Sequence, residues 1–168
     1  MTLELKRLTA PSLDAALEKA KQYRALNQPD EAVSICKDVL DVAPDHQAAL
    51  RILGLSLTDE FRTSWVALFD QAIGVFAKLK SEYERLYYTG VAWERCGKAQ
   101  LEHGQGQNAV LSLQSAISFF EQAEKLEPAD SPDPVLRYNR CVRLLTEHPL
   151  LAEARSSGHG WHEFQHGD

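Results

Sequence analysis

The chain has 168 residues, about the length of one domain, and its formal net charge is −6 at pH 7. Apolar residues make up 44% and charged residues 25%, which is typical of a globular protein that folds without metal or disulfide cross-links. The negative charge argues against nucleic acid as a partner. Leu and Ala together outnumber Val, Ile and Thr by more than two to one, so we expect an all-α fold.

The cellular setting is predicted from what the sequence lacks. Charged residues interrupt every apolar stretch, so we expect no membrane span, and the first residues lack the apolar region of a signal peptide. Cys36, Cys96 and Cys141 are scattered and form no C-x-x-C motif. Scattered thiols in odd number indicate a reducing compartment, and we therefore expect a cytoplasmic protein.

Apolar residues at helical spacing, bounded by turn residues, predict a series of helices along the chain. They span residues 12–27, 29–44, 45–57, 65–79, 81–103, 108–126 and 134–146, followed by a short helix that Pro149 opens.

Turn and capping residues set the predicted boundaries. Ser12 and Asp45 are expected to cap the first and third helices, and a polar break covers residues 58–62. Ser81 begins an S-x-x-E capping box, which favours a break between the fourth and fifth helices. Residues 104–106 form the turn before the sixth helix, and residues 155–168 are expected to form a flexible tail.

An internal repeat connects these helices. The second, fourth and sixth helices share an alanine followed at intervals of four and three residues by two larger residues: Ala32-Cys36-Val39, Ala72-Phe76-Leu79 and Ala116-Phe120-Ala123. In two of the three a proline follows five residues later, at Pro44 and Pro128. The preceding helices carry a small residue at a matching place: Ala20, Gly54 and Gly90. A small residue there allows close approach at a helix crossing, and the three alanines are expected to lie opposite.

These residues resemble the tetratricopeptide repeat family. The resemblance implies a single domain over residues 1–154 with the fold of a right-handed α–α superhelix of antiparallel helix pairs. The pairs would cover about residues 13–46, 47–80 and 81–130, with a polar-faced capping helix at about 134–147. Extra residues in the third pair predict a long, protruding hairpin formed by the fifth and sixth helices.

The same resemblance implies a non-enzymatic interaction scaffold that binds a peptide or partner protein in a concave groove and needs no cofactor. Matching positions along the first helix of each pair predict the groove lining: Lys21, Arg24, Arg51, Leu55, Tyr87, Val91 and Glu94. Cations at one end and apolar side chains at the other would suit a partner with acidic residues and an apolar anchor.

Two other function classes have sequence features of their own. His159, His162 and His166 are weak metal candidates, because a helix would place their imidazoles on one side, and they carry the alternative of a metal-binding or metal-regulated accessory protein. The glycines around them disfavour such a helix. An enzyme is not expected, because the sequence holds no phosphate-binding loop, metalloprotease motif or nucleophile–base set.

Overall fold

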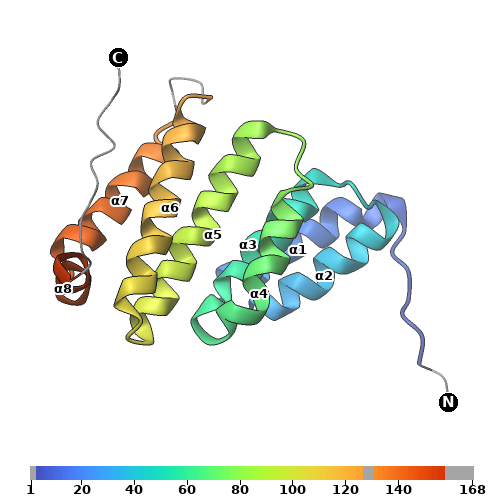
Figure 1. Cartoon of the computed structure of the whole chain (residues 1–168). Helices are drawn as coiled ribbons and strands as arrows, with labels where there is room; N and C mark the ends of the chain where they lie inside the picture. The colour runs from blue at the N-terminus through green and yellow to red at the C-terminus, as the bar shows by residue number, and fades with distance from the viewer. Residues whose placement is uncertain (1–2, 127–130, 158–168) are drawn as a thin grey trace.

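The computed structural model describes residues 3–126 and 131–157, and within these ranges all regular secondary structure is helical (Figure 1). This confirms the all-α prediction. A 3-10 turn, η1 (Ala10–Ser12), leads into helices α1 (Leu13–Ala25), α2 (Pro29–Val42), α3 (Gln47–Asp59), α4 (Phe61–Phe76), α5 (Glu82–Glu102), α6 (Gly106–Glu124), α7 (Asp133–Glu147) and α8 (Pro149–Ser157).

Two of the predicted boundaries are confirmed by the backbone. Asn27 ends α1 in the left-handed region, with a φ of 58°, which lets the chain reverse before Pro29 opens α2. Ser81 caps α5, because its hydroxyl oxygen accepts a hydrogen bond from the backbone N–H of Glu84 at 3.3 Å. Helices α4 and α5 are therefore separate.

The N-cap of α3 differs from the prediction. His46, not Asp45, occupies the cap, and its Nδ1 accepts from the backbone N–H of Ala49. Asp45 instead pairs with Lys80, which precedes α5. Ser12 does stand before α1, but its side chain makes no capping hydrogen bond.

The predicted polar break between α3 and α4 is wrong in length and in burial. Helix α3 continues to Asp59, and α4 begins two residues later at Phe61. Thr58 is buried despite its hydroxyl, because the hydroxyl donates to the carbonyl oxygen of Leu55 one turn earlier. The irregularity lies inside α4, at Ser64, where the backbone is non-helical.

Each helix packs on the next helix along the chain. Several helices that are two apart in the chain, such as α1 and α3, also touch. Contacts join α1 to α2, α3 to α4, α5 to α6 and α7 to α8, and the first members of these pairs touch in the order α1, α3, α5, α7 (Figure 1). Two apolar cores result, one over α1–α5 and one over α5–α8, and Leu55 and Tyr88 pack against both.

The helix crossings within pairs are close where small residues were predicted. A Cβ added at Gly90 would lie 2.7 Å from Cε1 of Phe120, so the backbone of α5 approaches the ring directly. The alanines expected opposite are fully buried, but at Gly54 and Gly90 the nearest neighbour is the aromatic residue one turn beyond them. The ring of each aromatic residue therefore packs directly against the glycine backbone.

The hairpin of α5 and α6 is long, as predicted, with helices of 21 and 19 residues joined at Gly104, whose φ is 73°. It does not protrude freely. Helix α8 packs across the start of α6, and a Cβ at Gly106 would lie 3.3 Å from the carbonyl oxygen of Leu150. The sequence does not predict this cover, because a helix of nine residues is too short for its apolar pattern to show which helices it contacts.

Candidate functional site

A layer of ion pairs connects the first helices α1, α3, α5 and α7. We call this surface the first-helix face and define it by the charged residues that bridge these helices together with one tyrosine: Arg24, Arg51, Asp59, Glu84, Tyr87, Glu94, Arg95, Lys98 and Arg137. Each bridge joins residues 33 to 50 positions apart, apart from the i,i+4 pair of Glu94 and Lys98.

The Asp59 centre lies at the C-terminal end of α3. Arg24 on α1 donates from Nε to Oδ2 of Asp59 at 2.7 Å, and Arg95 on α5 donates from Nη1 to Oδ1 of the same carboxylate. Arg95 also donates to the hydroxyl of Thr58 and to the carbonyl oxygen of Leu55. One carboxylate therefore holds two guanidinium groups and ties three helices together.

The Glu94 centre lies between α5 and α7. Glu94 is 1% exposed, and its two oxygens accept from Nζ of Lys98 and, at 2.7 Å, from Nη1 of Arg137. Burial alone raises the pKa of Glu94, but the hydrogen bonds and charges of Lys98 and Arg137 outweigh it and hold the pKa below its ordinary value. Glu94 is therefore an anion at neutral pH.

Aromatic rings lie beside the Glu94 centre. Tyr83 and Tyr87 stack with their centroids 5.7 Å apart, and Tyr87 also packs against Phe120. The hydroxyl of Tyr87 accepts from Nε of Arg137 at 3.2 Å. Tyr87 thus combines a core contact with a half-buried surface position.

The structure brings together four of the seven residues predicted to line a groove. Arg24, Arg51, Tyr87 and Glu94 lie on the first-helix face, where Arg51 pairs with Glu84 at the start of α5. Each of the predicted arginines is therefore already bound to a carboxylate, which the spacing of the residues did not reveal.

The other three predicted lining residues are placed differently. Lys21 is exposed and pairs with Glu18 on its own helix, and Leu55 packs between the two apolar cores. Val91 is fully buried and offers no surface to a partner, and Glu94, at 1% exposed, is reached only through the residues that cover it. Val91 belongs to the apolar core that α5 shares with α6, α7 and α8.

Asp59, Arg95 and Lys98 of the first-helix face are not predicted from the sequence as functional residues, and the sequence does not predict the pairing of Arg137 with Glu94. Arg95 and Asp59 are 36 residues apart, and Arg137 and Glu94 are 43 apart. The i,i+4 spacing of Glu94 and Lys98 was the one local signal, because a helix places such a pair together.

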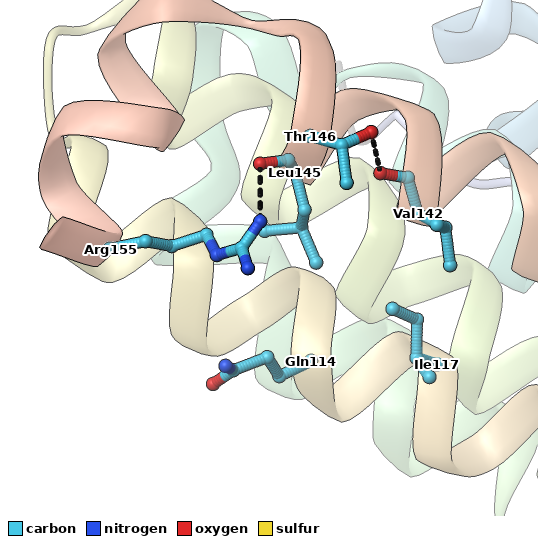
Figure 2. A pocket seen from close by; sticks show the side chains of 6 residues that line it. All are labelled: Gln114, Ile117, Val142, Leu145, Thr146 and Arg155. Atoms are coloured by element: carbon cyan, nitrogen blue, oxygen red, sulfur yellow. Dashed lines mark hydrogen bonds between the residues drawn. The ribbon is translucent and has the colours of Figure 1, made fainter. Parts of the chain in front are cut away.

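A pocket of about 290 Å³ opens elsewhere, between α6, α7 and α8 (Figure 2). Ile117, Val142 and Leu145 form its apolar wall. Arg155 reaches across from α8 and donates from Nη1 to the carbonyl oxygen of Leu145 at 3.1 Å. Helix α7 carries both Arg137 of the first-helix face and the pocket residues Val142, Leu145 and Thr146.

The remaining candidate residues from the sequence are the three cysteines and the C-terminal histidines. Cys36, Cys96 and Cys141 are buried and unbonded, and burial raises the pKa of each thiol. His159, His162 and His166 lie outside the described residues. Among the residues that are described, no cluster of His, Cys, Asp or Glu has the arrangement of a metal site.

Comparisons with protein-family models, with curated proteins and with solved structures give no match to this chain. In the parts of the chain that the structure covers, none of the helices has the length and apolar character needed to cross a bilayer.

Proposed function

We propose that this protein is a non-enzymatic scaffold that binds a peptide or a partner protein across its first-helix face. The repeat residues resemble those of tetratricopeptide repeats, and in superhelices of that kind the first helices of the pairs line the concave side. The observation that carries the proposal is the ion-pair layer itself. It ties α1, α3, α5 and α7 into one surface, so that a partner would meet side chains already held in place.

The chemistry of this face favours a partner with acidic residues and an apolar anchor. Arg24 and Arg51 keep about a quarter to a third of their side-chain surface exposed, at 24% and 35%, although each is paired. The stacked Tyr83 and Tyr87 lie on α5, on either side of Glu84, the partner of Arg51. Aromatic rings of this kind commonly supply binding energy. Cations fix the register of an acidic segment, and the rings would take its apolar side chain.

We also propose a reducing, cytoplasmic setting for this protein. All three cysteines of the chain are unbonded, and each is buried in a helix interface where it acts as a small apolar residue.

A pull-down from lysate tests the proposal with two variants that change charge equally. Arg51→Glu reverses a cation on the first-helix face. Arg62→Glu reverses a cation on α4, where Arg62 pairs with Glu102 outside that face. We expect a partner to be retained by the wild type and by Arg62→Glu and lost with Arg51→Glu. Equal capture by all three chains would place the partner surface elsewhere.

A further inference from the structure

The pocket between α6, α7 and α8 is a feature that the proposed scaffold function does not use. Its volume of about 290 Å³ lies at the lower end of the range for small-molecule sites, which is about 300–1,000 Å³. The described residues that line it come from all three helices: Gln114 and Ile117 from α6, Val142, Leu145 and Thr146 from α7, and Arg155 from α8. A volume of this size suits a ligand with few non-hydrogen atoms.

The sequence at the end of α7 fixes a guanidinium group beside the pocket. In a continuing helix the carbonyl oxygen of Leu145 would accept a hydrogen bond from residue 149, but residue 149 is a proline and has no N–H. Arg155 fills this role from α8, because its Nη1 donates to that oxygen at 3.1 Å. The bond holds the half-buried, positively charged side chain of Arg155 in a defined position at the pocket.

Polar and aliphatic groups lie at opposite ends of the pocket. The amide of Gln114 lies at the same end as the guanidinium group of Arg155, and Ile117 and Val142 lie at the other end (Figure 2). The side chain of Leu145 lies between the two ends (Figure 2). A bound molecule would therefore meet hydrogen-bond donors at one end and aliphatic side chains at the other.

The polar end has the chemistry of a carboxylate site. Among the described lining residues Arg155 is the charged one, and a guanidinium group matches a carboxylate in both charge and geometry. The amide nitrogen of Gln114 can donate a further hydrogen bond. The hydroxyl of Thr146 adds little polarity, because it donates within α7 to the carbonyl oxygen of Val142 at 2.9 Å.

We propose that this pocket binds a small monocarboxylic acid with a short aliphatic chain. The carboxylate lies at Arg155 and Gln114, and the chain lies along Leu145 toward Ile117 and Val142. A ligand with a second charged group fits less well, because that charge would lie against aliphatic side chains. The inference is independent of the proposed scaffold, since none of the pocket residues belongs to the first-helix face.

The experiment is a titration of the full-length chain, labelled with ¹⁵N, at constant ionic strength. Sodium hexanoate is the probe. Hexanamide has the same chain without the charge, and acetate has the charge without the chain. We expect hexanoate to shift backbone amides around residues 114–117, 142–146 and 155. Each control should need a concentration at least about tenfold higher, because it lacks one of the two features that the pocket recognises.

Three variants test the role of Arg155. Arg155→Met removes the charge but keeps an apolar stem, and it should weaken hexanoate binding by about tenfold. Arg155→Lys keeps the charge and should stay within about threefold of the wild type. Arg143→Met is the matched control, because Arg143 is an exposed cation on α7 that does not line the pocket, and its affinity should change by less than about twofold.

Several results would overturn the proposal. These are equal affinity for hexanoate and hexanamide, shifts confined to other helices, and unchanged affinity in a folded Arg155→Met chain. If Arg155→Met fails to fold, the location of the wild-type shifts and the difference between hexanoate and hexanamide decide. Binding that occurs only in a chain ending at Ser157 would also overturn the proposal, because residues 158–168 of the chain itself would then be the occupant.

Discussion

Gly54 on α3 faces the ring of Phe76 on α4 so closely that a Cβ atom at Gly54 would lie 2.2 Å from Cε1 of the ring. Phe76 is fully buried and is stacked on Tyr88 with centroids 5.3 Å apart, so the ring has no free space into which to move. The crossing of α3 and α4 therefore depends on the absence of a side chain at position 54.

Replacing Gly54 by leucine should destabilise the protein strongly. The new side chain must displace Phe76 or separate α3 from α4, and overpacking of this kind costs about 1–3 kcal/mol or more. Gly74 is the matched control, because it lies on α4 with no atom near its added Cβ. Urea unfolding should show a large loss of free energy for Gly54→Leu and none for Gly74→Leu. Similar midpoints for the two variants would show that the crossing is not as close as described.

Truncation should separate the last helix from the residues after it. A chain that ends at Ser157 lacks a segment with three glycines and no periodic apolar face, so it should melt like the full chain. A chain that ends at His148 also loses α8 and with it Leu151, which is fully buried against α6 and α7. Its melting temperature should fall by about 5 °C or more. A comparable fall in the Ser157 chain would mean that residues 158–168 contribute to the fold.

The thiols should be unreactive in the folded protein. Burial raises the pKa of Cys36 and of Cys141 to about 12, and it raises that of Cys96 as well, so few thiolates exist at about pH 8. A thiol-specific chromogenic reagent should label the cysteines of the native chain slowly. In denaturant it should label all three cysteines rapidly. Rapid labelling of the native chain would contradict their burial.

The sequence predicted the helices well because their ends are marked locally. Pro29 and Pro149 open helices, Asn27 closes one, and Ser81 lies three residues before Glu84 in a capping box. Such signals act within one or two turns, and the structure follows them. At His46 the local rule failed, because an imidazole nitrogen took the capping role that the carboxylate of Asp45 was expected to play.

The site was less predictable because its contacts are long-range. The repeat pattern predicts Arg24 as a site residue, yet its partner Asp59 lies 35 residues away and is shared with Arg95. No spacing rule links a residue at the end of α3 to two others on α1 and α5. Val91 shows the opposite error, since a repeat position alone does not reveal that the neighbouring helices bury it completely.

The Glu94 centre should make stability depend on pH in acid. The folded pKa of Glu94 lies below its ordinary value of 4.5, because Lys98 and Arg137 outweigh the effect of burial. An acid with a lowered folded pKa adds stability above its unfolded pKa, and this stability is lost as the pH falls through the folded pKa. The contribution should therefore be full at neutral pH and should decline below about pH 4.5.

Comparison of the wild type with Glu94→Gln measures this contribution. We expect the variant to lose about 1–3 kcal/mol of unfolding free energy at neutral pH, because two cations lose their buried partner. The difference should stay constant down to about pH 5 and then shrink as the wild-type carboxylate is protonated. Asp45→Asn is the control. Hydrogen bonding to Lys80 also lowers the pKa of Asp45, but this carboxylate is exposed, and water screens the pair. Its removal should leave the pH dependence nearly unchanged, and a Glu94→Gln curve that runs parallel to the wild type at every pH would show that Glu94 is not the titrating group.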